Sequence, residues 1–156
     1  MILKSALAKP SGHSHYIPIP DQVATKILEE FGKRVYCVIN GKMSLHCAIL
    51  FSKNRGYYIM VGKATMKKIL VRPNEPFELE IKKDNSPYQA EVPEELTVVL
   101  ETDELAAKAF DALTPGRQRT IIYHIGKAKH SETRITRALK ITDFLKIGVS
   151  DLRLMK

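Results

Sequence analysis

The strongest constraint in this sequence is an internal repeat in its first half, at an offset of 42 residues. Residues 16–20 (Tyr-Ile-Pro-Ile-Pro) align with residues 58–62 (Tyr-Ile-Met-Val-Gly), and residues 35–39 align with residues 77–81 without a gap. Each copy is typical of a strand, a short helix over residues 21–30 or 63–70, a turn, and a second strand. The repeat therefore predicts two equivalent halves of one small structure.

Two further strands are expected beside the repeated ones. Residues 40 and 41, Asn-Gly, are the strongest short signal for a hairpin turn. The N-terminal residues 2–8 align with residues 44–50 at the same offset and are expected to form a sixth strand. Short strands with a pseudo-twofold repeat predict a small closed six-stranded β-barrel, because closure removes exposed strand edges. Residues 43–51 alternate in polarity and place five apolar side chains on one face: Met43, Leu45, Cys47, Ile49 and Phe51.

The second half of the chain has helical periodicity. Residues 91–95 are expected to be a linker, followed by helices over residues 96–113, from residue 115, and from residue 131. The expected N-caps are Thr102 or Asp103, then Thr114, then Ser131. The fold class is therefore α+β, with a barrel domain over residues 1–90 and a helical appendage over residues 91–156. The side chains expected to face inward are Leu105, Ala109, Phe110, Leu113, Ile121, Ile122, Ile125, Ala128, Ile135, Ala138, Leu139 and Leu145.

The composition excludes several classes of protein. The 156 residues include two cysteines, too few for a disulfide scaffold, so reduced thiols and a cytoplasmic location are expected. No apolar run approaches the roughly 20 residues that a transmembrane helix needs, so no membrane insertion is expected. The first ten residues do not have the pattern of a secretory signal.

The net charge of +8 is distributed unevenly along the sequence. Residues 1–106 hold 14 Lys and Arg against 13 Asp and Glu, whereas residues 107–156 hold 11 against 4. This excess favours an anionic partner such as nucleic acid, phospholipid or an acidic protein. The alternative is a solvated helical surface that is basic without a binding role.

The second half also carries a specific residue pattern. It comprises residues 92–96 (Val-Pro-Glu-Glu-Leu), 110–115 (Phe-Asp-Ala-Leu-Thr-Pro), 118–119 (Gln-Arg), 128–129 (Ala-Lys) and 132–134 (Glu-Thr-Arg). This pattern resembles the YdeI/OmpD-associated family, also called bacteriocin-protection proteins. Residues 16–20, 39–41 and 62–63 resemble the β-barrel domain of unknown function that usually precedes it.

The resemblance implies a six-stranded barrel akin to double-psi and swapped-hairpin barrels, followed by a helical appendage. It also implies a link to envelope stress and outer-membrane porins. It implies no established reaction and offers no catalytic residues.

The best candidate site is a set of basic residues on the C-terminal helices. Arg guanidinium groups can grip phosphate or carboxylate with two hydrogen bonds, and a tyrosine can stack on a ring. The alternative is a structural latch, in which Arg134 forms a salt bridge with a neighbouring helix and Tyr123 packs against the barrel. The candidate residues are Arg119, Tyr123, Lys127, Lys129, Arg134 and Arg137.

No known catalytic motif is present, so we expect neither an enzyme nor a cofactor. His13 and His15 lack a nearby third metal ligand and are expected to lie in a flexible polar loop rather than a metal site. The two cysteines, Cys37 and Cys47, are expected to pack in the core. His46 is expected to be a hydrogen-bonded histidine of the barrel wall.

Three functional hypotheses follow. The first is a non-enzymatic cytoplasmic binding or stress protein whose basic helical face binds an anionic ligand or protein partner. The second is a nucleic-acid-binding module, since swapped-hairpin barrels resembling this repeat can bind DNA. The near-neutral charge expected for the barrel half, and the lack of a strand that interleaves basic and aromatic residues, count against it. The third is an enzyme of unrecognised chemistry.

Overall fold

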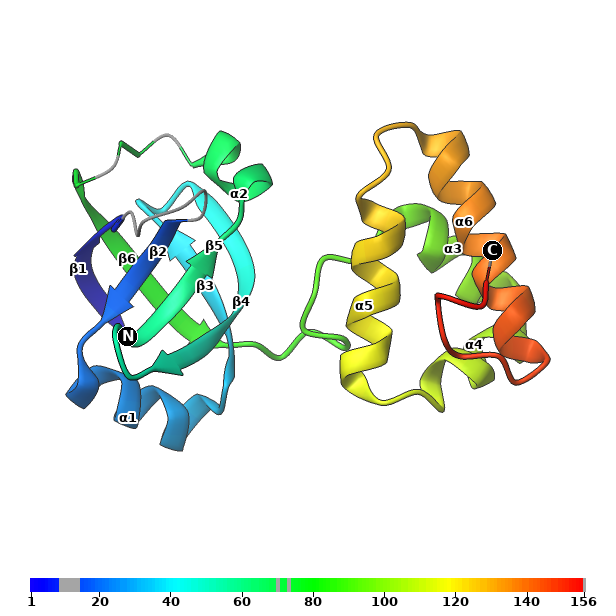
Figure 1. Ribbon diagram of the computed structural model, residues 1–156, viewed down its shortest axis with the longest axis horizontal. Helices are drawn as coiled ribbons and strands as arrows, with labels where there is room; N and C mark the ends of the chain where they lie inside the picture. Colours follow the sequence, from blue (N-terminus) through cyan, green and yellow to red (C-terminus); the bar gives the residue numbers. More distant parts are fainter. Residues whose placement is uncertain (9–14, 70, 73, 156) are drawn as a thin grey trace. The chain divides into compact units, whose positions relative to one another are not determined.

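Six antiparallel strands build the first of the two units into which the chain divides, Met1–Gln89 and Ala90–Lys156. The computed structural model describes residues 1–8, 15–69, 71–72 and 74–155. The strands lie in the order β1-β6-β3-β4-β5-β2 and form a nearly closed barrel, with a bridge between Ala8 and Tyr16 across the gap (Figure 1). The strands are β1 (Ile2–Ala6), β2 (His15–Ile19), β3 (Arg34–Ile39), β4 (Met43–Ser52), β5 (Gly56–Val61) and β6 (Pro76–Lys83).

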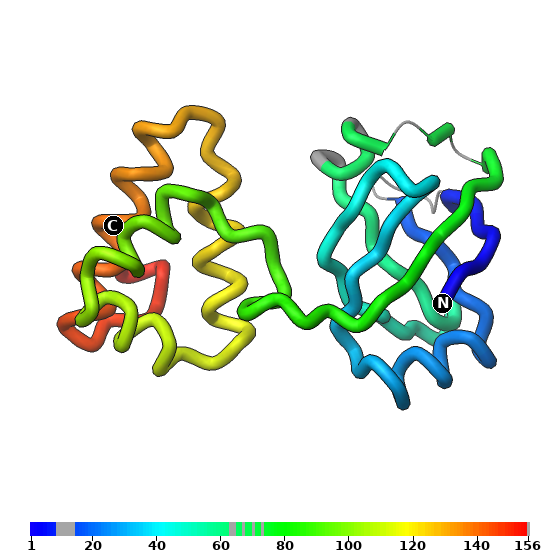
Figure 2. Tube along the Cα trace, turned by 180° about the vertical axis from the view of Figure 1, so that it is seen from behind, coloured from blue at the N-terminus to red at the C-terminus, as the bar shows by residue number. Residues whose placement is uncertain are grey.

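Two helices of this unit, α1 (Asp21–Phe31) and α2 (Lys63–Lys68), lie at opposite ends of the barrel (Figures 1 and 2). Each follows a strand directly, and Pro20 and Gly62, expected as the strand ends, are the N-cap residues of α1 and α2. Helix α1 ends at Gly32, whose φ of +78° lies in the left-handed region that glycine adopts without strain.

The core of the barrel comes from alternate residues on the strands. Ile17, Val35, Ile59, Leu79 and Ile81 are completely buried, and Cys37 and Cys47 are buried among them. This confirms the predicted alternation and the predicted packing of both cysteines. The expected α+β class, with a six-stranded barrel and a helical C-terminal part, is likewise confirmed.

The strand pairing is compatible with the predicted repeat. Ile17 pairs with Ile59, which is its own counterpart at the offset of 42. The offset also relates two other pairs to each other. Ile2 pairs with Glu80, and their counterparts at the offset of 42, Ser44 and Val38, pair with each other as well. The superposition of residues 16–39 on residues 58–81 in space stays a prediction.

Two expectations about the barrel were wrong in detail. Phe51, expected on the inner face of β4, is 61% exposed, one residue before the end of the strand and beside the turn into β5. His15 lies in β2, paired with Val61, rather than in a loop. His13 lies outside the described residues.

The second unit contains four helices within the described residues, and two of the expected boundaries differ: α3 begins at Glu94, inside the segment expected to be a linker, and a break divides the next segment. The segment expected to be one helix over residues 96–113 is broken at Asp103, whose Oδ1 accepts a hydrogen bond from the backbone N–H of Ala106 at 2.9 Å. Asp103 was one of the two expected caps, and it begins a new helix. The helices are α3 (Glu94–Thr102), α4 (Glu104–Asp111), α5 (Pro115–Gly126) and α6 (Ser131–Lys146).

Three apolar residues expected to face inward are exposed instead. The break at Asp103 sets a new helical phase in which Ala106 and Phe110 are buried and Leu105 faces solvent. In α6 the buried stripe is Ala138, Ile141, Thr142 and Leu145, which leaves Ile135 and Leu139 on the outside. Ser131 is not the cap of α6 either, because the cap position is His130 and the Ser131 hydroxyl donates to Glu95 at 2.7 Å.

The pairing of Ile17 with Ile59 leads to a stability prediction. I17A and I59A should each lower the free energy of unfolding by about 2–5 kcal/mol, because both leave a cavity in the same core. The measurement is urea unfolding followed by tyrosine fluorescence, since five of the six tyrosines lie in residues 1–89. I2A, which truncates an exposed side chain of β1, is the control and should change the free energy by less than about 0.5 kcal/mol. A loss in only one of the two core variants would contradict their equivalent placement.

Candidate functional site

Arg119, Tyr123 and Lys127 follow one another at intervals of four residues along α5 and its C-terminal end. Ile121, Ile122 and Ile125 are buried and define the inner face of the helix. Tyr123 and Lys127 are exposed, and Arg119, one turn earlier, is partly exposed. Lys127 directly follows the last residue of α5, so the stripe runs to the C-terminal end of this helix.

Arg134 contacts three residues in other segments of the helical unit. Its Nε and Nη2 atoms both lie 2.8 Å from Oε1 of Glu95, at the start of α3. Its Nη1 donates to the backbone carbonyls of Ala128 and Lys129, at 3.1 and 3.2 Å. Arg134 therefore ties α6 to α3 and to the α5–α6 connection, as the latch hypothesis describes.

Glu95 is the carboxylate on which this connection depends. The hydrogen bonds from Arg134 and from Ser131 lower the pKa of Glu95 to about 2. The same pair raises the pKa of Arg134 above its ordinary value. Both groups are therefore charged at neutral pH.

Positive charge gathers at the C-terminal end of α5. Nη1 of Arg137 donates to the backbone carbonyl of His124 at 2.7 Å. The pKa of His124 is lowered, first by burial and then by the nearby charges of Arg137 and Lys127. Carbonyl groups at a helix C-terminus favour cations, so the end of α5 attracts these side chains. Lys129, two residues beyond Lys127, is exposed.

The boundary between the two units changes the meaning of the charge distribution. Residues 107–156 do hold an excess of positive charge. The helical unit, however, begins at residue 90 and therefore also includes the acidic residues between 90 and 107. Residues 90–156 hold 11 Lys and Arg against 10 Asp and Glu, whereas residues 1–89 hold 14 against 7. Within the helical unit, Glu95 pairs with Arg134, Asp103 with Lys146, and Glu104 with Lys108. Most of the net positive charge therefore belongs to the barrel, which corrects the expectation of a near-neutral barrel.

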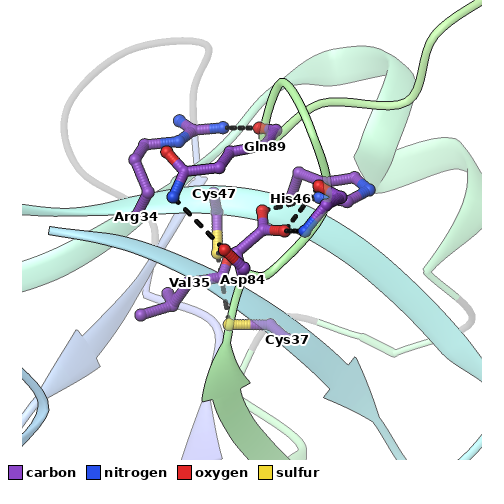
Figure 3. A network of polar contacts seen from close by, with 8 residues as sticks. Arg34, Val35, Cys37, His46, Cys47, Asp84 and Gln89 are labelled. Carbon is purple, nitrogen blue, oxygen red and sulfur yellow. Dashed lines mark hydrogen bonds and ion pairs between the residues drawn. The ribbon is translucent and has the colours of Figure 1, made fainter. Parts of the chain in front are cut away.

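A second polar cluster lies on the barrel and is centred on a buried carboxylate, Asp84 (Figure 3). Its Oδ2 lies 2.7 Å from Nδ1 of His46, and its Oδ1 accepts hydrogen bonds from the hydroxyl and the backbone N–H of Ser86. Gln89 Nε2 donates to the backbone carbonyl of Asp84, and Arg34 donates to the carbonyl of Gln89. The ring of His46 meets the ring of Tyr36 edge to face. The cluster fastens the segment after β6 to the outside of β3 and β4.

The ionisation of Asp84 follows from these contacts. Burial by itself would raise the pKa of Asp84, but the hydrogen bonds from Ser86 and His46 outweigh it and lower the pKa. The carboxylate therefore stays charged at neutral pH although it is buried. His46 is thus a hydrogen-bonded histidine of the barrel wall, as predicted.

The arrangement around His46 does not form a nucleophile–base pair within the described residues. The Ser86 hydroxyl donates to Asp84 rather than to the histidine ring. Cys47 donates to the Sγ of Cys37 at 3.2 Å, and this contact together with burial raises the pKa of the Cys37 thiol. A buried, protonated thiol is a poor nucleophile. The cluster is therefore suited to holding backbone in place.

Metal-ligating side chains do not gather anywhere in the part of the chain that the structure describes. No three His, Cys, Asp or Glu side chains among those residues come together as a metal site would require. In the same residues, no helix has the length and apolar character to cross a bilayer.

Comparison with known families agrees with both units. The model of a domain of unknown function, DUF1905, matches residues 4–81, a range that includes β2 to β5 and most of β1 and β6. The chain belongs to the DUF1905 family. In this DUF1905 protein the helical unit is similar to a second family, described as bacteriocin-protection, YdeI or OmpD-associated, which matches residues 89–148. The two matches confirm the resemblance noted in the sequence. Neither description names a reaction, and comparison with curated proteins and with solved structures found no significant match.

Sequence reasoning missed the two carboxylates on which these sites depend. Glu95 was assigned to a linker, and its partner Arg134 lies 39 residues away in the chain. Asp84 follows the last strand and meets His46 across 38 residues. The Glu-Thr-Arg motif was recognised as a possible latch, but its spacing alone does not identify the carboxylate that completes it.

Asp84→Asn provides a test of the barrel cluster. Because the folded-state pKa of Asp84 is lowered, its contribution to stability is present above the ordinary aspartate pKa of about 3.9 and is lost as the pH falls through the folded-state value. D84N should therefore lower the free energy of unfolding by about 1–3 kcal/mol at pH 7. The difference from the parent protein should shrink as the pH falls below about 4. Urea titrations at several pH values measure this, with E29Q, an exposed carboxylate on α1, as a control without effect.

Arg134→Ala provides a test of the latch. The variant should lower the melting temperature of the helical unit at pH 7, measured by circular dichroism at the helix band. Since the pKa of Glu95 is lowered to about 2, this difference should shrink as the pH falls from about 4 toward that value. R153A is the matched control, because Arg153 is highly exposed and pairs with Asp151, two residues away. Equal melting temperatures for R134A and R153A would refute the latch.

Proposed function

We propose that this DUF1905 protein is a non-enzymatic binding protein whose helical unit engages an anionic partner. The contact residues are the predicted set Arg119, Tyr123, Lys127, Lys129, Arg134 and Arg137. The observation that supports the proposal best is the clustering of charge at the end of α5. Arg137 donates to the carbonyl of His124 there, Lys127 directly follows the helix, and no salt bridge within the described residues involves Lys127 or Lys129.

Arg134 and the two lysines, Lys127 and Lys129, have different tasks in this proposal. Arg134 acts by holding the carbonyls of Ala128 and Lys129, which keeps the connection that carries the lysines in one conformation. Lys127 and Lys129 then meet the anion with their charged ends. A binding surface that is already ordered loses less conformational entropy when it binds.

The remaining residues extend the surface along α5. Tyr123 is exposed one turn before Lys127 and offers an aromatic face, while Arg119 lies a further turn away. Such a row favours an elongated anionic partner over a single small ion. A cytoplasmic location and a role in stress are part of the proposal, the latter resting on the bacteriocin-protection family to which the helical unit is similar.

Heparin affinity chromatography tests the proposal with a defined polyanion. The double variant K127Q/K129Q should elute at a lower salt concentration than the parent protein. With two fewer lysine contacts, binding to heparin releases fewer counterions and is therefore weaker. K108Q is the matched control within the same unit, since Lys108 already pairs with Glu104 at 2.7 Å. Melting temperatures of both variants should equal that of the parent protein, because exposed lysines add little stability. Elution of K127Q/K129Q together with K108Q would exclude this surface.

A further inference from the structure

The line along which α3 and α6 meet carries apolar side chains that are not part of the core of the helical unit. The two helices pack against each other and run in the same direction. Glu95 at the start of α3 meets Arg134 near the start of α6, and Asp103 just after α3 meets Lys146 at the end of α6. The two ion pairs therefore mark the stripe of each helix that faces the other.

Two apolar residues of α6 lie on the stripe that Lys146 marks. Ile135 precedes Lys146 by eleven residues and Leu139 precedes it by seven. At about 100° of rotation per residue, both side chains lie within about 20° of the direction of Lys146. Ile135 is 44% exposed and Leu139 is 49% exposed. Both therefore turn toward α3 but remain on the solvent side of the contact between the two helices.

Helix α3 adds a matching stripe from its own side. Val98 and Thr102 follow Glu95 by three and seven residues, and residues at these spacings share one face of a helix. Val98 is 50% exposed. The Thr102 hydroxyl donates to the backbone carbonyl of Val98 at 2.7 Å, so its polar group is satisfied within the helix. Val98, Thr102, Ile135 and Leu139 thus form one solvent-facing surface, which we call the outer seam. Apolar side chains that gather in this way, rather than singly, mark interaction surfaces.

Acidic residues border the outer seam on both helices. Each of four exposed carboxylates lies three or four residues from one of the apolar side chains on its own helix, and such residues are neighbours on a helix surface. They are Glu94, Glu101, Glu132 and Asp143. The first three take part in no salt bridge within the described residues.

Basic residues do not neutralise this border. None of the residues three or four positions away from Val98, Ile135 or Leu139 is basic. Lys146 is already held by two carboxylates, Asp103 at 2.7 Å and Asp143 at 2.8 Å. Lys140 follows Leu139 in sequence and therefore lies about 100° farther round α6. The outer seam is thus an apolar strip within a negatively charged border.

We propose that the outer seam is the docking site for a basic amphipathic helix of a partner protein. Such a helix lies along the seam and places its apolar row against Val98, Ile135 and Leu139. Lysines or arginines beside that row meet the bordering carboxylates, and this complementarity of charge selects the partner. Two copies of this chain that paired through their outer seams would bring the acidic borders together, and repulsion between like charges disfavours that arrangement.

The test is fluorescence anisotropy of the full chain with a labelled synthetic peptide that contains only leucine and lysine. The peptide has about 14 residues, and its leucines follow the spacing of one helix face. Two peptides of equal length serve for comparison. One has the same residues in an order that forms no apolar face, and the other has glutamate in place of lysine. The amphipathic leucine–lysine peptide should bind about tenfold more tightly than either.

Variants of the outer seam show whether the peptide lies there. L139A should weaken binding by about fivefold or more, the scale of truncating a central apolar side chain of an interface. E101Q/E132Q should weaken it by about threefold or more at low salt, and this loss should shrink as the salt concentration rises. If L139A lowers the melting temperature, E101Q/E132Q decides the outcome alone, since it changes two exposed side chains.

Two matched controls lie on the barrel and should stay within about twofold of the parent protein. I2A also truncates an exposed apolar side chain, and E29Q/E30Q also removes two exposed carboxylates from one helix. K127Q/K129Q should bind the peptide no more weakly than the parent protein, because a basic peptide gains nothing from those lysines.

Three results would overturn the proposal. The first is a leucine–lysine peptide that binds no more tightly than the two comparison peptides. The second is binding by L139A and E101Q/E132Q that matches binding by their controls. The third is a parent chain that sediments as a dimer while L139A sediments as a monomer, since a second copy would then cover the outer seam.

Discussion

The alternation of inward and outward residues along short strands is the constraint on which the barrel depends. Six strands of this length enclose a core only if each turns every second side chain inward. Ile17 and Ile59, which pair with each other, and Leu79 and Ile81 on β6 meet this condition and are completely buried. The side chains at the outward positions are not part of the core. Tyr36, His46 and Tyr58 occupy such positions: His46 holds Asp84 and meets Tyr36, and Tyr58 meets Tyr16.

The helical unit depends on a different interaction, between Glu95 and Arg134. Its helices are short, and α3 and α4 are separated by a break at Asp103. Short helices owe most of their stability to tertiary packing rather than to their own propensity. Arg134 joins the start of α3 to the α5–α6 connection, and Lys146 joins the end of α6 to Asp103. Ion pairs with good geometry thus secure both ends of α6, whose buried face between them is small.

The two units place their charge differently, and this matters for any anionic partner. In the helical unit, three acidic residues before residue 107 form ion pairs with basic residues after it. These pairs are Glu95 with Arg134, Asp103 with Lys146 and Glu104 with Lys108. In the barrel, basic residues outnumber acidic ones twofold. Electrostatic attraction acts over about 8–10 Å in salt, so it reflects the folded unit and not the linear sequence. Local clusters, such as the one at the end of α5, persist within a nearly neutral unit.

The sequence by itself determined the elements and much of the packing. The 42-residue offset, the Asn-Gly turn and the alternation in residues 43–51 predicted six strands and a barrel, and the Thr-Pro pair predicted the start of α5. These signals are local, since they depend on backbone preferences and on periodicity within a few residues. Tertiary structure alone decided which carboxylate meets His46 and Arg134, because Asp84 and Glu95 are brought to them across more than 35 residues of chain. It also decided that Phe51 is exposed and that Leu105 and Leu139 face solvent. The first outcome depends on how far the core extends along a strand, and the other two depend on which face of a helix packs against its neighbours.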